Sequence, residues 1–169
     1  MVKENLAIPD FERINPTRLT IQLSEMYWFY QDLVKNPDLG KKVGKDVMSF
    51  FEHGSKIGML EQMLASRRRL TIIEGLSRVL KDVDFIAMPT CLTTAPKIEE
   101  VSGHEAGSIR RQLVRNTELF NLTGLPSLSI PTNDLNSSEL PTAMQISGRP
   151  LEDNDLLEVG ERIWKSIHE

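Results

Sequence analysis

The order of the expected helices and strands predicts an α/β fold in which helices cover a small sheet. Two observations lead to this prediction. Apolar residues recur at helical spacing in the first half of the chain, and the second half holds three short apolar runs separated by helical segments. Three strands are few for such a sheet, since sheets more often contain about four to six. The sequence therefore predicts either a small fold or one part of a larger sheet.

The first half is expected to form three helices. The first opens at Asn15-Pro16, a capping residue followed by proline at the first helical position. It ends at Asn36-Pro37, where a turn is expected. A shorter helix follows over about 41–52 and a long one over about 56–81. Within the first helix the apolar residues recur every three or four positions: Leu19, Leu23, Met26, Tyr30 and Leu33.

The second half is expected to alternate strands with helices. Short apolar runs closed by proline, glycine or turn residues favour buried strands. Such runs occupy residues 84–88, 127–131 and 142–147. A loop over 91–103 and a helix over 105–120 separate the first two, and a last helix begins near Asp153.

Composition excludes several classes of protein. The 169 residues include 20 Lys+Arg against 24 Asp+Glu, a net charge of -4 that argues against a general nucleic-acid binder. One cysteine, Cys91, excludes internal disulfides and fits a reducing compartment. No apolar run approaches the roughly 18 residues that span a membrane. The histidines are scattered, and no cofactor motif is complete. We expect a soluble, cytoplasmic protein without metal or cofactor.

Arg69 is the candidate binding residue. On a helical wheel of about 100° per residue it falls within an apolar stripe made of Ile72, Ile73, Leu76, Leu80 and Val83. A guanidinium on a core-facing stripe needs an anionic or carbonyl partner. Two interpretations follow. Arg69 forms a structural ion pair near water at the end of the stripe, or it anchors the carboxylate of a ligand.

Ser127 and Ser129 are candidates of another kind, for a nucleophile. Alternation along a strand places both hydroxyls on one face. A nucleophilic serine needs a base beside it, and the sequence places none near either residue. We therefore expect these serines to form the polar face of a strand, and we expect no catalytic residue in this chain.

Several short motifs follow one another in a fixed order. They are Ala65 with Arg69, Asp84 with Pro89-Thr90, Asn121 to Pro131, Leu140-Pro141 with Gln145 and Gly148, and the acidic helix start over 153–161. In this order and spacing they resemble the C-terminal part of the amidase signature family, which contains bacterial amidases and the A subunit of glutamyl-tRNA(Gln) amidotransferase. The resemblance extends from about residue 17 to 165. It implies that residues 1–169 are one C-terminal portion of an α/β/α sandwich, without the N-terminal catalytic part.

The resemblance also implies a reaction. In the complete enzyme a carboxamide is hydrolysed by two serines and a lysine, which lie in the family's N-terminal half. Their Gly/Ser-rich segment has no counterpart in this sequence. This chain is then expected to supply a substrate-pocket wall and strands, and to be inactive alone. The expected partners are the missing N-terminal half or a second copy, with a small amide as substrate, and neither membranes nor nucleic acids.

The substrate is only partly implied. In the family's amidotransferases, the arginine that matches Arg69 binds the carboxylate of glutamine. The acidic residue that receives the glutamine amino group there falls at Val114, which cannot do so. A glutamine amide and a general amide both stay open. The alternative function is a non-catalytic binding or assembly module derived from an amidase.

Overall fold

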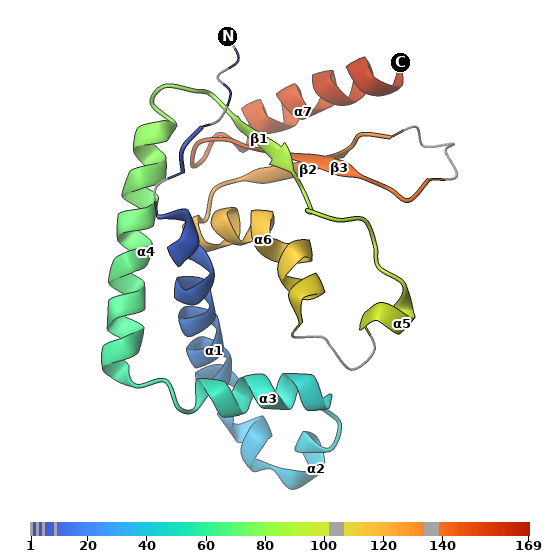
Figure 1. Cartoon of the computed structure of the whole chain (residues 1–169). Coiled ribbons are helices and arrows are strands. Elements are labelled where there is room, and N and C mark those ends of the chain that lie inside the picture. The colour runs from blue at the N-terminus through green and yellow to red at the C-terminus, as the bar shows by residue number, and fades with distance from the viewer. Residues whose placement is uncertain (1, 3, 5, 9, 102–106, 134–138) are drawn as a thin grey trace. The chain divides into compact units, whose positions relative to one another are not determined.

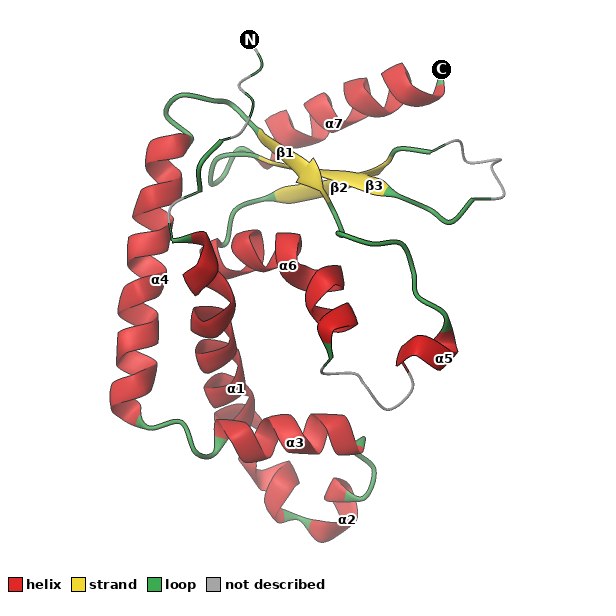
Figure 2. Ribbon diagram, viewed as in Figure 1, coloured by secondary structure: helices red, strands yellow, loops and turns green. Residues whose placement is uncertain are grey.

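The computed structural model describes the chain except residues 1, 3, 5, 9, 102–106 and 134–138 (Figure 1). The chain divides into two compact units, one of residues 12–72 and one of residues 1–11 and 73–169. The first unit is helical and the second contains the sheet (Figure 2). Within the described part of the chain, no helix is long and apolar enough to cross a membrane.

The helical unit is built from α1 (Phe11–Lys35), α2 (Pro37–Gly40), α3 (Lys45–Gly54) and most of α4 (Met59–Val79). α3 approaches α1 so closely at Gly54 that a Cβ there would lie 2.1 Å from the carbonyl oxygen of Leu23. α4 lies beside α1 and is linked to it by the Ser24 hydroxyl, which donates to Gln62 Oε1 at 2.8 Å. Ile14, Phe51 and Ala65 are buried in this unit.

The helices expected in the first half are present, but the predicted start of the first one was wrong. α1 begins at Phe11, so Pro16 lies inside the helix. The φ angle of proline suits a helix, although its missing N–H removes one hydrogen bond. Burial of Ile14, which is 3% exposed, stabilises the turn that precedes Pro16. α1 is also kinked at Tyr30, whose φ of -109° and ψ of 15° are not helical.

The second unit contains a three-stranded sheet, which confirms the predicted fold class. Its strands are β1 (Ile86–Pro89), β2 (Ser127–Pro131) and β3 (Ala143–Ser147). β3 lies between the other two and is antiparallel to both. In this register Gln145 lies between Met88 and Ser129.

Helices cover the strands on opposite sides (Figure 1). α7 (Asp153–His168) packs on β2 and β3 around a core of Ile130, Ile146 and Leu156. α6 (Ser108–Thr123) lies on the other side and ends at Gly124, whose φ of 75° is the left-handed conformation that favours glycine. The loop expected before α6 contains one short helix, α5 (Ile98–Val101).

Candidate functional site

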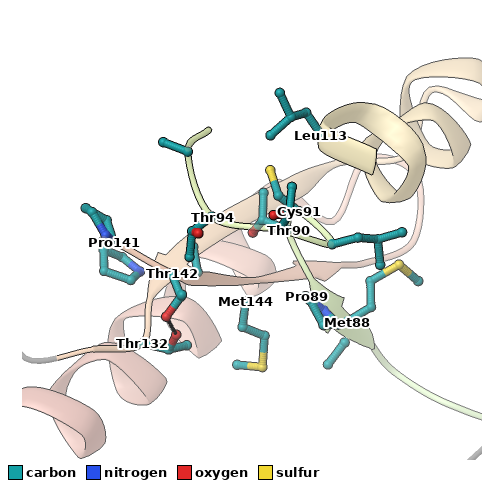
Figure 3. A pocket seen from close by; sticks show the side chains of 16 residues that line it. Met88, Pro89, Thr90, Cys91, Thr94, Leu113, Thr132, Pro141, Thr142 and Met144 are labelled. Carbon is teal, nitrogen blue, oxygen red and sulfur yellow. Dashed lines mark hydrogen bonds between the residues drawn. The ribbon is translucent and has the colours of Figure 1, made fainter. Parts of the chain in front are cut away.

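A hollow of about 750 Å³ opens where β1 ends (Figure 3). It is lined by β1 and the segment after it, by Leu113 of α6, and by the neighbouring ends of β2 and β3. The lining residues are 87–95, Leu113, 131–132 and 141–144. Its size is that of a typical small-molecule site. No side chain in this lining is charged, so the hollow suits an uncharged, largely apolar group.

The polar groups of the hollow are hydroxyls and one thiol. Thr90 Oγ1 lies 2.8 Å from the hydroxyl of Ser129, which is not part of the lining. Figure 3 shows the contact between the hydroxyls of Thr132 and Thr142, which are 3.0 Å apart. Cys91 is half-buried among them. The lining contains no histidine, lysine, aspartate or glutamate. It therefore offers hydrogen bonds to a ligand but no general acid or base, and hydrolysis would need groups from another part of the enzyme.

The serines of β2 have partners on β3 and on the segment that follows β1. The Ser127 hydroxyl donates to Ser147 Oγ at 3.1 Å, and Ser147 in turn donates to the Pro126 carbonyl at 2.8 Å. Ser129 is paired with Thr90, as above. Both serines thus tie the sheet together, as expected of a small polar face.

Gln145 is a motif residue whose environment the sequence could not predict. Its side chain lies on β3 and the residue is 3% exposed. Its Nε2 amide has no hydrogen-bond partner within the described residues. Buried polar groups are nearly always hydrogen-bonded, so an amide donor without a partner is unusual.

Arg149 is a structural residue that sequence reasoning missed. Its guanidinium donates to the carbonyls of Leu80 at 3.0 Å and Val83 at 3.2 Å, and to Asp84 Oδ1 at 3.0 Å. The hydrogen bond with Asp84 raises the pKa of Arg149, against the opposing effect of desolvation. Arg149 therefore fixes the segment that enters β1 beside the segment that leaves β3. No local pattern in the sequence indicates this role, because the partners lie 65–69 residues earlier in the chain.

Arg69 lies on α4, three residues before the buried Ile72 and four after the buried Ala65. Its side chain is exposed, so the long stem reaches water although the position belongs to the buried side of the helix. Its role as an anchor stays a prediction.

Metal ligation was not expected from the sequence. Among the residues that the structure describes, no group of three His, Cys, Asp or Glu side chains could hold a metal ion. His104 lies outside the described residues.

Curated relatives are amidases and amidotransferase components. The chain is 37% identical over 101 residues to the A subunit of a glutamyl-tRNA(Gln) amidotransferase from Sulfolobus acidocaldarius, covering 60% of this chain and 20% of the relative. It is 27% identical over 158 residues to an amidase of Pseudomonas putida, covering 90% of this chain and 33% of that protein. The chain thus spans between a fifth and a third of the length of these two relatives.

Solved structures share the fold. A crystal structure of an amidase has a TM-score of 0.82 at 20% identity, covering 96% of this chain and 37% of that one. An allophanate hydrolase of Kluyveromyces lactis has a TM-score of 0.77 at 24% identity, covering 94% of this chain and 26% of that one. At these identities the likeness shows the fold alone.

The family is shown by a match to most of the chain. The family model described as Amidase matches residues 18–157, which include all three strands, most of α1 and the first turn of α7. The ordered motifs noted in the sequence lie almost entirely within this range. This chain belongs to the amidase family.

Proposed function

We propose that this chain is the C-terminal portion of an amidase-family hydrolase that cleaves a carboxamide when an N-terminal catalytic part completes it. One observation carries the proposal. The Amidase model matches residues 18–157, yet the chain spans only 20% and 33% of the two relatives described above. The resemblance assigns the two serines and the lysine to sequence outside the matched portion.

The chemistry divides between the two parts. In the proposed reaction a serine oxygen attacks the amide carbon, and its proton passes through a second serine and the lysine to the leaving nitrogen. Backbone N–H groups would stabilise the oxyanion. Water then hydrolyses the acyl-serine ester and releases the acid. All these groups come from the N-terminal part, and the hollow beside Thr90 forms a wall for the uncharged portion of the substrate.

Arg69 is proposed to bind a carboxylate of the substrate. This role is supported by its match to the family motif and by its exposed position on α4. Whether the amide belongs to glutamine depends on the amino-group contact. Val114 on α6 cannot provide an ionic contact, which favours an amide without that amino group. The cytoplasmic location expected from the single cysteine stays part of this proposal.

The second candidate is a non-catalytic binding module derived from an amidase. It is favoured by the lining of the hollow, which has hydroxyls but no acid or base. The two candidates predict different results when the rest of an amidase is supplied. The first predicts hydrolysis of an amide, and the second predicts none.

A chimera tests the proposed function. This chain replaces the matched third of the Pseudomonas putida amidase, and hydrolysis of small amides is measured for the chimera and for the chain alone. We expect turnover by the chimera and none by the chain. A folded chimera without turnover would favour the binding module. Turnover by the rigorously purified chain would refute the proposal that the catalytic groups belong to the N-terminal part.

A further inference from the structure

α4 has apolar side chains on two opposite sides. One side carries the buried Ala65 and Ile72. The other carries five large apolar residues that are 51–81% exposed. We call this set the outer face of α4: Met59, Leu60, Met63, Leu64 and Leu70. At about 100° per residue these five lie within an arc of about 140°, centred roughly opposite Ala65 and Ile72. The apolar part of this arc is the first half of the helix, because Thr71, Glu74 and Arg78 continue the same arc in the second half.

An ordinary surface helix has one apolar stripe and one polar side. A helix that is apolar on both sides is typical of one that is buried on both. The inner side of α4 packs beside α1, as the hydrogen bond from Ser24 to Gln62 requires. The outer face continues onto α1, because Trp28 and Met59 line one hollow of about 340 Å³. Trp28 is 68% exposed. Exposed apolar residues that gather on one face in this way, rather than singly, are typical of interaction surfaces.

We propose that the outer face of α4 is the docking surface for the N-terminal part of the amidase. This inference rests on the proposed function and identifies one surface that this part covers, in addition to the side of α4 that carries Arg69. The length of the relatives supports this occupant over a second copy. The chain corresponds to 37% of the amidase chain whose fold it shares, so such an enzyme has ample further polypeptide to cover the face.

Arg67 gives the docking surface its specificity. It lies near the middle of the outer face on the helical wheel, and its side chain is exposed. Burial of a guanidinium without a partner would be very costly. The covering polypeptide must therefore place a carboxylate or several carbonyl oxygens opposite Arg67, surrounded by apolar side chains.

Methionine oxidation provides a test with a readout other than activity. Met59 and Met63 are 81% and 63% exposed, so dilute peroxide should oxidise both rapidly in the isolated chain. In the chimera with the Pseudomonas putida amidase, mass spectrometry should find both oxidised at least ten times more slowly. The rate in the urea-unfolded chimera calibrates full exposure.

Substitution provides the second arm. Leu60→Lys with Met63→Lys places two charges in the outer face, and Asn154→Lys with Ser166→Lys adds the same charge at exposed positions of α7. In the isolated chain both pairs should leave the unfolding midpoint nearly unchanged, because exposed positions tolerate substitution. In the chimera the first pair should lower the yield of folded protein at least tenfold, and the α7 pair should not.

The outcomes separate the two proposals. Turnover by the chimera without protection of Met59 and Met63 would overturn the docking surface and leave the proposed function standing. Protection of Met59 and Met63 without turnover would overturn the proposed function and leave the docking surface standing. A chimera with neither protection nor turnover would reject both proposals. Protection in the isolated chain that rises with its concentration would assign the face to a second copy, and would also overturn the inference.

Discussion

At the scale of single residues, the family motifs of this chain serve its architecture more visibly than its chemistry. Asp84 accepts from Arg149 where the chain enters β1, and Gly124 ends α6 in a left-handed conformation. Pro89 ends β1, and its carbonyl accepts from the Asn116 side chain at 2.7 Å. Gln145 is different, because it is buried and its amide nitrogen lacks a partner within the described residues.

Most core substitutions lower the free energy of unfolding, and we predict that substitution of Gln145 does not. Gln145→Met removes an unsatisfied donor and keeps the volume, so the free energy of unfolding of the isolated chain should stay unchanged or rise by about 1 kcal/mol. Ser147→Ala is the control on the same strand. It removes two hydrogen bonds of a fully buried hydroxyl and should lower that free energy by about 1–2 kcal/mol. Urea denaturation measures both, and a large loss with Gln145→Met would contradict the interpretation.

Arg69 permits a test that separates binding from folding. In the chimera, Arg69→Met should raise the KM for an amide that bears a carboxylate at least tenfold, because a charge-assisted hydrogen bond is lost. The KM for an uncharged amide should change little. Arg78→Met is the control, since Arg78 pairs with Glu74 on the exposed surface of the same helix. Equal effects of Arg69→Met on both substrates, together with a lower unfolding midpoint, would instead support a structural ion pair.

At the scale of elements, periodicity predicted the type of the principal helices and strands. The strand over 127–131 has the predicted bounds, and the strand over 142–147 begins one residue later than predicted. The predicted start of α1 was wrong because proline marks a first helical position only statistically. Strand order was not predicted, because the position of β3 between β1 and β2 depends on pairing across long loops. Arg149 was missed for the same reason, since its partners lie 65–69 residues earlier.

Helix packing was equally inaccessible to the sequence, and Gly54 illustrates it. A Cβ at this position would meet the Leu23 carbonyl oxygen at 2.1 Å, and a backbone atom cannot move aside as a side-chain end can. Gly54→Ala should therefore lower the free energy of unfolding by about 1–3 kcal/mol. Gly58→Ala, where nothing lies within 4 Å of the added Cβ, should be nearly neutral. Similar values for the two variants in thermal or urea unfolding would mean that α1 and α3 are not in this close contact.

At the scale of the whole molecule, the exposed outer face of α4 and the short span of the chain support the same inference. A chain that matches the Amidase model over 18–157 shares its fold with one part of a solved amidase and spans only a fraction of its relatives' length. Hydrophobic burial is the main favourable term in folding. On the function proposed above, burial of the outer face of α4 by the N-terminal part would therefore add to the stability of the complex.

The exposed outer face of α4 should be visible in the isolated chain as binding of an apolar fluorescent dye. Dye binding alone would also result from a molten globule, so near-ultraviolet circular dichroism and a cooperative unfolding transition must first establish fixed packing. The Leu60→Lys and Met63→Lys pair should then reduce the dye signal severalfold, because it places charge in the outer face of α4. The Asn154→Lys and Ser166→Lys pair on α7 should leave the signal within about a fifth of the parent value, since charge at those positions covers no apolar surface. Equal reduction by both pairs would attribute the signal to net charge, and a natively packed chain without any dye signal would show that the outer face binds no apolar group.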